Sequence, residues 1–416
     1  MHLYDSFGDA TVTFEDRKNP VRIYVCGITP YASSHLGHAF TYAAGDVLVR
    51  YLQYKGFTTR YVQNVTDIDD PIIRESKKQN MDWRELGRKC TVRFIDEMKT
   101  LNILPPDFFP KATEVIDSIL ETVAKLVDAG AAYESGGSVF YSVKGCRDFG
   151  RRSGTPKERR LEIANDRGNH PDDSRKRDPL DFPLWQAQEE GEPSWDSPWG
   201  PGRPGWHSEC STMANRYLNG RVDIHGGGSD LAFPHHEAEI AQFESAEGKS
   251  PFARCWFHTA MVHHEGEKMS KSVGNLVMVK DLLRKYSADG IRLYLASQHY
   301  REPWPHNPAH LAASEALAQK LRTAVENNPE EFKSGSSEPG QYREAFEDAM
   351  DDDLDTPRAI ELFSDIADAG LHSPVPGLTT LLLELSSVLG IRLGKDPESD
   401  RLQGWDRHRA RFDSNG

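Results

Sequence analysis

The sequence has 416 residues, a length that accommodates two or three domains. It is 38% hydrophobic and 27% charged, has no apolar run near the roughly 18 residues that span a bilayer, and begins without the features of a signal peptide, so we expect a cytoplasmic protein. The net charge of −14 weakly disfavours a long nucleic acid as a partner. Five scattered cysteines indicate free thiols or metal ligands rather than a disulfide framework.

A strand, a turn and a helix are predicted near the N-terminus. Residues 22–26 alternate and are rich in β-branched and aromatic side chains, which predicts a strand that ends at Cys26. A helix is expected from His38 to Gly56. The intervening His35-Leu-Gly-His38 combines the free N–H groups of a helix start with two imidazoles, which suits a phosphate. Taken alone, this short pattern is more often a surface turn.

A cationic pentapeptide, Lys268-Met-Ser-Lys271-Ser, stands far downstream of the histidine pair. Two lysines in a flexible loop can close over a triphosphate and stabilise the leaving pyrophosphate. A lone lysine-rich pentapeptide is usually a solvated loop. The two signatures in this order, however, resemble the nucleotide site of class I aminoacyl-tRNA synthetases.

The middle of the chain predicts a sheet domain that is interrupted by an insertion. A strand at 59–65 precedes the acidic run Asp67-Ile-Asp-Asp, which is either a ligand site at a strand end or an Asx-rich turn. Residues 71–130 are expected to be mostly helical. Residues 132–200 change composition and indicate a small β-rich lobe with a mobile segment at 150–178. The sheet then resumes, and a strand from Val222 runs into three glycines that allow a ligand to approach the backbone.

The C-terminal part is predicted to be helical. Helices are expected at 359–369 and 381–389, and the polar residues 326–340 are interpreted as a linker. The last residues, 396–416, are interpreted as a disordered polar tail.

Four separate residues have the chemistry of a zinc site: Cys26, Cys210, His235 and Glu239. His235 and Glu239 are four residues apart and therefore share one face of a predicted helix. By spacing alone, unrelated cysteines are an equally good interpretation. A cysteine substrate gives the site a purpose, because its thiol can bind zinc as thiolate, which the hydroxyl of serine cannot match.

With these signatures present, the chain resembles cysteinyl-tRNA synthetases over residues 1 to about 395. It is more similar to a related family, the cysteine ligases of mycothiol biosynthesis, which join cysteine to the amine of glucosaminyl-inositol. The segments that carry this likeness are Cys26-Gly-Ile-Thr-Pro-Tyr, Val62-Gln-Asn-Val-Thr-Asp-Ile-Asp-Asp-Pro, Asp82-Trp-Arg-Glu-Leu and Gly202-Arg-Pro-Gly-Trp. Glu239 matches the synthetases instead, and Ala32 stands where both families usually carry Asp.

The resemblance implies an α/β fold: a class I synthetase-type, Rossmann-like nucleotide-binding domain with an inserted small lobe and a C-terminal helical domain. The expected boundaries are 1–131 and 201–285 for the catalytic domain, 132–200 for the lobe, 286–395 for the helical domain and 396–416 for the tail.

The resemblance also implies roles for individual residues. Zinc is held by Cys26, Cys210 and His235, with Glu239 as a candidate fourth ligand. Thr29, Thr66 and Trp206 lie around the cysteine. The cysteinyl-adenylate is bound by Thr41, Asn64, Val65, Gly228, Ser229, Asp230 and Val262. His35, His38, Lys268 and Lys271 stabilise the transition state of adenylate formation.

The expected function is an ATP-dependent ligase, a monomer that uses Mg-ATP and zinc to form cysteinyl-AMP and transfers cysteine to glucosaminyl-inositol. The alternative is a short cysteinyl-tRNA synthetase, for which the strongly acidic residues 341–355 offer no basic path to tRNA. A third interpretation is an inactive zinc- or nucleotide-binding regulator, which the intact histidines and lysines disfavour.

Overall fold

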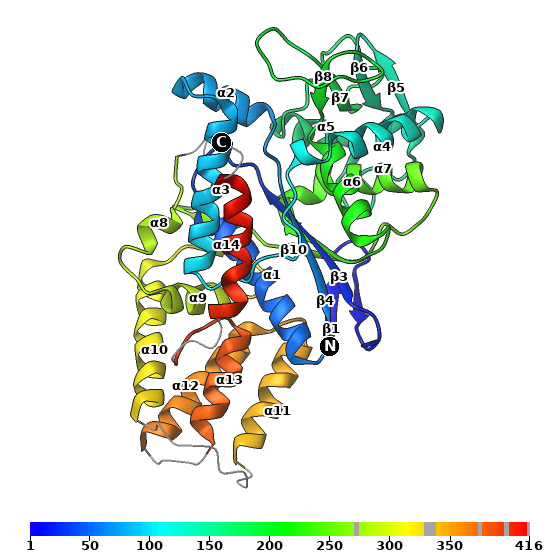
Figure 1. Cartoon of the computed structure of the whole chain (residues 1–416). Coiled ribbons are helices and arrows are strands. Elements are labelled where there is room, and N and C mark those ends of the chain that lie inside the picture. The colour runs from blue at the N-terminus through cyan, green and yellow to red at the C-terminus, as the bar shows by residue number, and fades with distance from the viewer. Residues whose placement is uncertain (270–273, 328–337, 373–376, 395–398, 414–416) are drawn as a thin grey trace.

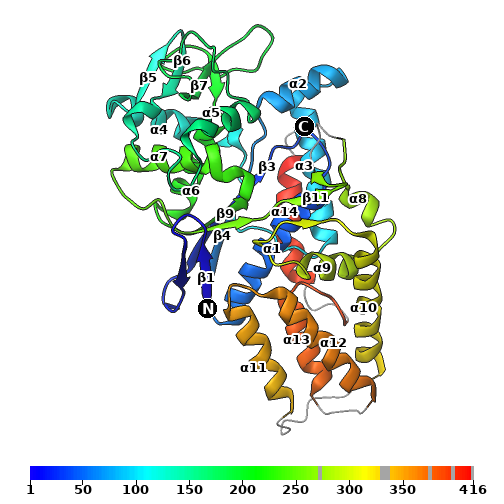
Figure 2. The same cartoon turned by 180° about the vertical axis from the view of Figure 1, so that it is seen from behind.

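The computed structural model describes residues 1–269, 274–327, 338–372, 377–394 and 399–413. Figure 1 shows a central sheet with a small lobe at one end and a bundle of helices at the other. Figure 2 shows from behind that the lobe and the bundle lie at opposite ends of the molecule. Within the described ranges, no helix is both long and apolar enough to span a bilayer.

The central sheet has four parallel strands in the order β10-β9-β3-β4. Their bounds are Val21–Ile28 for β3, Thr59–Val65 for β4, Val222–Gly228 for β9 and Ala253–Thr259 for β10. The bounds of β4 match the prediction. Because parallel strands end at the same edge of a sheet, the Cys26 end of β3 and the triple glycine of β9 meet there.

Helices cover both faces of this sheet. Along β3, Ile23 and Val25 pack in one hydrophobic core, and Tyr24 and Cys26 pack in a second. The first core includes α1 (Leu36–Tyr54) and the second includes α6 (His207–Leu218). The period-2 alternation of β3 therefore places Cys26 on the α6 face of the sheet.

The insertion forms a second, antiparallel sheet in the order β5-β6-β7-β8. Its strands are β5 (Ala132–Ser135), β6 (Ser138–Tyr141), β7 (Phe182–Ala187) and β8 (Gly202–Pro204), so the β-rich character of the lobe is confirmed. The segment 150–178, predicted to be mobile, contains helix α5 (Lys157–Asp166). Arg160 on α5 donates hydrogen bonds to the carbonyls of Phe149 and Gly150, and these bonds hold α5 against the start of the segment.

The C-terminal region is helical, as predicted. Its helices are α9 (Ala288–Ala296), α10 (Pro308–Asn327), α11 (Glu338–Asp351), α12 (Thr356–His372) and α13 (Leu378–Val388). The predicted linker 326–340 overlaps the ends of α10 and α11, and its residues 328–337 lie outside the described residues.

The prediction of a disordered tail is wrong for residues 399–413, which form helix α14 (Ser399–Asp413). This helix packs against α3 (Trp83–Thr100), as Figure 1 shows. Trp405 is fully buried there and its indole donates a hydrogen bond of 2.8 Å to the carbonyl of Ile103. A few apolar side chains in this polar segment are thus enough to pack α14 against the rest of the protein.

The remaining elements connect these layers. They are β1 (His2–Asp5), β2 (Ala10–Thr13), α2 (Asp70–Gln79), α4 (Ile116–Asp128), α7 (Glu237–Glu247), β11 (Val262–His264), β12 (Glu267–Lys268), α8 (Val279–Leu282), β13 (Trp304–Pro305) and the short turns η1 (Ala112–Glu114), η2 (Val143–Gly145), η3 (Ser229–Leu231) and η4 (Ala232–His236).

Candidate active site

The histidine pair lies at the start of α1, which begins at Leu36, two residues before the predicted start. His35 is the N-cap residue, and its Nδ1 accepts a hydrogen bond of 3.1 Å from the N–H of Gly37. The rings of His35 and His38 stack with centroids 3.8 Å apart. Because Nδ1 of His35 is an acceptor, a neutral His35 carries its proton on Nε2 and can donate it to a phosphate oxygen.

His38 is held as a neutral imidazole. Desolvation and the neighbouring His35 lower the pKa of His38 to about 3. Among the described residues, its buried Nδ1 has no hydrogen-bond partner. A neutral imidazole with an unused nitrogen can bond to a ligand that enters this site.

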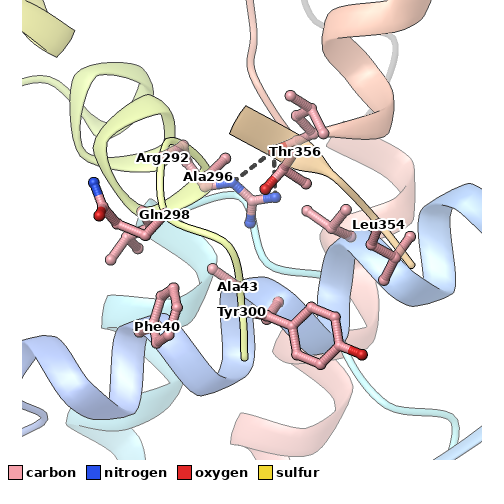
Figure 3. A pocket seen from close by; sticks show the side chains of 12 residues that line it. Phe40, Ala43, Arg292, Ala296, Gln298, Tyr300, Leu354 and Thr356 are labelled. Carbon is pink, nitrogen blue, oxygen red and sulfur yellow. Dashed lines mark hydrogen bonds between the residues drawn. The ribbon is translucent and has the colours of Figure 1, made fainter. Parts of the chain in front are cut away.

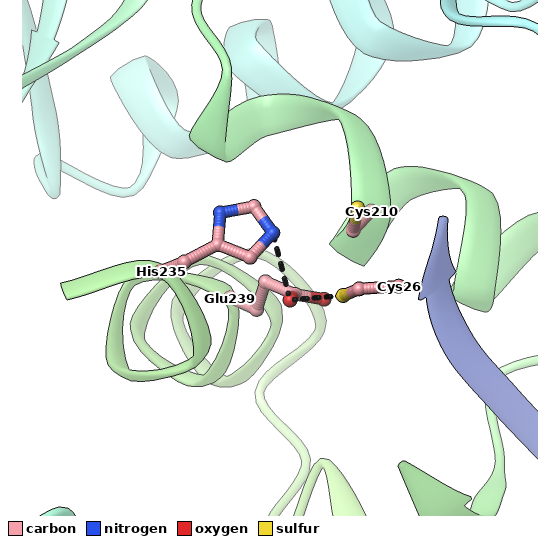
Figure 4. Close-up of side chains that lie close together, drawn as sticks. All are labelled: Cys26, Cys210, His235 and Glu239. Carbon is pink, nitrogen blue, oxygen red and sulfur yellow. Dashed lines mark hydrogen bonds and ion pairs between the residues drawn. The ribbon is translucent and has the colours of Figure 1, made fainter. Parts of the chain in front are cut away.

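The four predicted zinc ligands meet at one buried point, although they come from β3, α6, η4 and α7. The donor atoms of Cys26, Cys210, His235 and Glu239 lie within 4.8 Å of one another. Glu239 Oε1 lies 3.6 Å from Cys26 Sγ and 3.3 Å from His235 Nε2, as Figure 4 shows. The proximity expected from the sequence is therefore present.

The donor set fits a metal of zinc type. Two sulfurs, one imidazole and one carboxylate are common zinc ligands, and all four side chains are buried. Among the described residues, Glu239 Oε2 is buried without a hydrogen-bond partner, which a bound cation would relieve. Desolvation, followed by the neighbouring Cys210 and Glu239, raises the pKa of Cys26 well above its ordinary value, so without a cation this sulfur stays protonated.

Trp206 and His207 hold His235 in place. The Trp206 ring stacks on His235 with centroids 4.5 Å apart, and Nδ1 of His207 lies 2.9 Å from Nδ1 of His235. The carbonyl of His207 in turn accepts a hydrogen bond from Gln242. Trp206, predicted beside the cysteine substrate, thus also orients a candidate metal ligand.

A series of hydrogen bonds runs from the end of β4 to α6. The N–H of Gly27 donates to Asn64 Oδ1, and Asn64 Nδ2 donates to Thr66 Oγ1. Thr66 then donates a hydrogen bond of 2.7 Å to the buried carboxyl of Glu209. Burial raises the pKa of Glu209 well above its ordinary value. Glu209 was not predicted as a site residue, although its position next to Cys210 was a signal.

Several predicted nucleotide contacts lie near the C-terminal ends of β9 and β10. Thr41 shares a hydrogen bond of 2.7 Å with Thr259 at the end of β10. Ser229 and Asp230 form η3 directly after the glycines of β9, and Arg167 of the lobe forms an ion pair of 3.0 Å with Asp230. Arg167 was missed, because nothing in the sequence relates α5 to this turn.

Four further predicted residues have different outcomes. Val65 and Val262 are buried core residues, at the end of β4 and at the start of β11. The backbone of Lys268 pairs with His263 in a short hairpin. Lys271 lies outside the described residues. The predicted roles of the two lysines stay predictions.

A cleft of about 1140 Å³ lies between α2 and the lobe. Thr29, Trp206 and His207 line one part of it, and Asp69 and Arg167 are among its many charged residues. Desolvation, with the nearby Asp70, raises the pKa of Asp69 to about 7. The cleft thus extends from the predicted cysteine pocket towards a charged surface.

A second, small cavity lies between α1, α9 and the C-terminal helices, as Figure 3 shows. Its lining is mainly apolar and includes Phe40, Ala296 and Leu354, with the guanidinium of Arg292 at its edge. None of the predicted site residues lines it, so we interpret it as a packing defect between domains.

A family model described as "tRNA synthetases class I (C) catalytic domain" matches residues 13–316. The chain belongs to this class I synthetase family. Its fold is the class I aminoacyl-tRNA synthetase fold predicted from the sequence: an α/β domain with a parallel sheet and a helical C-terminal region.

Curated relatives of this class I family protein include two kinds of enzyme. A cysteine–tRNA ligase of Dehalococcoides mccartyi is 42% identical over 94% of this chain and 87% of that protein. The L-cysteine:1D-myo-inositol 2-amino-2-deoxy-alpha-D-glucopyranoside ligase of Thermobispora bispora is 41% identical over 94% of this chain and 96% of that protein. The protein is therefore an ATP-dependent cysteine ligase.

Among solved structures, the methionyl-tRNA synthetase of Mycobacterium tuberculosis in complex with methionyl-adenylate is similar to this chain. The TM-score is 0.61 at 15% identity, with 94% of this chain and 93% of that chain covered. This likeness shows the fold alone, and it agrees with the arrangement of the sheet and the C-terminal helices.

Proposed function

We propose that this protein activates L-cysteine with Mg-ATP as cysteinyl-AMP and transfers the cysteinyl group to tRNA(Cys). The observation that carries the activation step is the buried quartet of Cys26, Cys210, His235 and Glu239, in the same domain as the His35–His38 pair. Several relatives that are 42–43% identical are named cysteine–tRNA ligases, and this similarity supports the acceptor.

Zinc bound by the quartet would supply a Lewis acid that holds the substrate as thiolate. Other side chains of the protein contact the remainder of the cysteine substrate. Trp206 and Thr29 form the wall of the pocket that opens to the cleft. Thr66, held by Asn64 and Glu209, presents a fixed hydroxyl beside it. A pocket of this shape alone separates near-isosteric substrates by about 10- to 200-fold.

In the first half-reaction, the cysteine carboxylate attacks the α-phosphorus of ATP and pyrophosphate leaves. The Nε2–H of His35 and the neutral imidazole of His38 donate hydrogen bonds to phosphate oxygens on which charge accumulates. The positive end of the α1 helix dipole adds a positive partial charge there. In the second half-reaction, a ribose hydroxyl of tRNA attacks the acyl carbon and AMP leaves.

Glucosaminyl-inositol, the acceptor favoured by the resemblance of several sequence segments, is the second candidate. It is supported by the match to 96% of the Thermobispora ligase. The cleft beside Trp206 also carries carboxyl groups, including Asp69, whose pKa of about 7 would allow it to take a proton from an attacking amine.

Cysteine-dependent AMP release tests both candidates when it is measured first without RNA and then after addition of each acceptor. We expect slow release with cysteine and ATP alone, strong stimulation by tRNA(Cys) and no stimulation by glucosaminyl-inositol. Stimulation by the amino-sugar alone would replace the first acceptor with the second. Absence of cysteine-dependent exchange of pyrophosphate into ATP would contradict the activation step itself. Serine in place of cysteine is the matched control.

A further inference from the structure

A second group of four buried side chains surrounds the same point as the predicted zinc quartet. The donor atoms of Cys26, His225, His236 and Glu239 also lie within 4.8 Å of one another. Cys26 and Glu239 belong to both groups, whereas His225 comes from β9 and His236 from the end of η4. Neither histidine was predicted as a site residue from the sequence.

The distances within this second group are close to those of a tetrahedral site. His225 Nε2 and His236 Nε2 lie 3.7 and 3.4 Å from Cys26 Sγ. The same two nitrogens lie 3.3 and 3.9 Å from Glu239 Oε1. A tetrahedron with metal–nitrogen bonds of about 2.0–2.1 Å and one metal–sulfur bond of about 2.3 Å has edges of about 3.3–3.6 Å. The four donors therefore need little movement to bind one ion.

A chain of hydrogen bonds fixes the tautomer of His236. Ser6 donates its hydroxyl proton to the carbonyl of Trp256 at 2.9 Å, so its oxygen accepts from Nδ1 of His258 at 2.5 Å. Nε2 of His258 is then an acceptor, and the Nδ1–H group of His236 donates a hydrogen bond of 2.7 Å to it. His236 is left with an unprotonated Nε2 that faces Cys26 and Glu239. Metal-binding histidines are oriented in this way by outer partners.

His225 shows a complementary feature. Its ring is fully buried and stacks on Tyr24 with centroids 5.1 Å apart, which fixes its plane. Among the described residues, its Nδ1 is buried without a hydrogen-bond partner, so the polar contacts of this ring are those of Nε2 with Cys26 and Glu239. The Nε2 atom of His225 is therefore directed to the same sulfur and carboxylate that His236 contacts.

We propose that Cys26, His225, His236 and Glu239 form a second position for a divalent cation of zinc type, next to the position formed with Cys210 and His235. Because both positions use the same sulfur and the same carboxylate, one ion occupies one of them at a time. The second position has one thiolate, two imidazoles and one carboxylate. An ion can thus stay bound in the protein when the Cys210 side of the site is changed.

Cobalt binding to the full chain tests this position independently of the acceptor and of catalysis. We expect the Cys210→Ala/His235→Ala variant to bind one Co²⁺ per chain. Its thiolate-to-cobalt absorbance should be about half that of wild type, since one of two thiolate ligands remains. Adding His225→Gln and His236→Gln to this variant should abolish binding. His264→Gln, at a histidine outside both groups, is the matched control and should change neither value.

Circular dichroism and the melting temperature establish that each variant is folded. A folded Cys210→Ala/His235→Ala variant that binds no Co²⁺ would overturn the proposal, and so would binding that persists after both glutamine substitutions. If the double variant does not fold, Cys210→Ser replaces it, with the same expected loss of half the absorbance. Loss of all absorbance in folded Cys210→Ser would equally reject the second position.

Discussion

Arg167 Nη2 lies 3.0 Å from the carboxylate of Asp230, and this ion pair joins the end of α5 in the inserted lobe to η3 of the sheet domain. Asp230 follows the glycines of β9, where the nucleotide is expected to bind. The lobe therefore has a direct contact through which its position can affect the nucleotide site, in addition to the packing of α5 against η4.

Replacing Arg167 by Ala should weaken nucleotide binding more than folding. Both side chains are partly exposed, so the pair contributes about 0–1 kcal/mol to stability. We expect the KM for ATP in pyrophosphate exchange to rise about three- to tenfold, equivalent to about 0.7–1.4 kcal/mol. Arg151→Ala breaks an exposed ion pair with Asp148 in the same lobe and should leave the KM unchanged. Equal effects of the two variants would contradict a specific role for Arg167.

Replacing Cys26 by Ala should remove the metal-dependent part of thiol selectivity, because this sulfur belongs to both groups of metal donors. Metal analysis should find less than one tenth of the wild-type zinc. The preference for cysteine over serine in pyrophosphate exchange should fall to the roughly 10- to 200-fold that pocket shape provides. Cys90→Ala, at a buried cysteine of α3, is the control and should keep both metal and selectivity. Full zinc content in Cys26→Ala would exclude this site.

Replacing Trp405 by Ala should destabilise the whole protein, although the residue lies in the segment expected to be disordered. Its ring is fully buried against Phe94 and Phe109. Truncating such a ring costs about 3–5 kcal/mol, which urea unfolding would measure. Gln403→Ala, on the exposed side of α14, should change the unfolding free energy by less than about 0.5 kcal/mol. An unchanged Trp405→Ala protein would show that α14 does not contribute to folding.

The sequence predicted the parts of the structure that depend on local patterns. Strand β4 and the turn from Cys26 to the histidine pair follow from alternation, glycine placement and helix-start chemistry. Helix α14 was missed because its apolar residues are few, and their partner, α3, is about 300 positions away in the chain. The period of a lone polar segment does not show whether a partner surface exists.

The metal donors divide in the same way. The first group could be predicted because recognition of a thiol requires soft metal ligands, and a family resemblance supported the choice. This group contains Cys26, Cys210, His235 and Glu239. His225 and His236 stand in a strand and at a helix start, and only the fold brings their Nε2 atoms to the same sulfur. A hydrogen-bond chain through Ser6 and His258 cannot be inferred from spacing, because its members are about 250 residues apart.

Replacing His38 by Asn should slow adenylate formation with little change in substrate binding. The neutral imidazole is expected to act on charge that develops in the transition state, and loss of one such donor reduces kcat by about 100- to 1,000-fold. Pyrophosphate exchange gives kcat and KM separately, and the KM for cysteine should stay within about threefold of wild type. Tyr31→Phe, at a neighbouring residue of the cleft, is the control. A reduced affinity with unchanged kcat would contradict the proposed role.

Replacing His258 by Gln should make the protein less sensitive to acid. Desolvation lowers the pKa of His258 to about 3, whereas the unfolded chain titrates near pH 6.5. The unfolded state therefore binds the proton first as the pH falls. The stabilising contribution of the neutral, buried ring is complete above pH 6.5 and is lost at about 1.4 kcal/mol per pH unit towards pH 3.

Urea unfolding in the presence of a chelator, at pH 7.5, 6.0, 5.0 and 4.0, would measure this effect without metal release. His258→Gln cannot take up the proton, so its unfolding free energy should fall less steeply than that of wild type, by about 1.4 kcal/mol per pH unit below pH 6. Phe257→Leu removes buried apolar surface on the same strand but no ionisable group, so it should lower stability equally at every pH. Identical slopes for wild type and His258→Gln would show that His258 becomes protonated in the folded protein, and the buried hydrogen-bond chain would then not hold it in its neutral form.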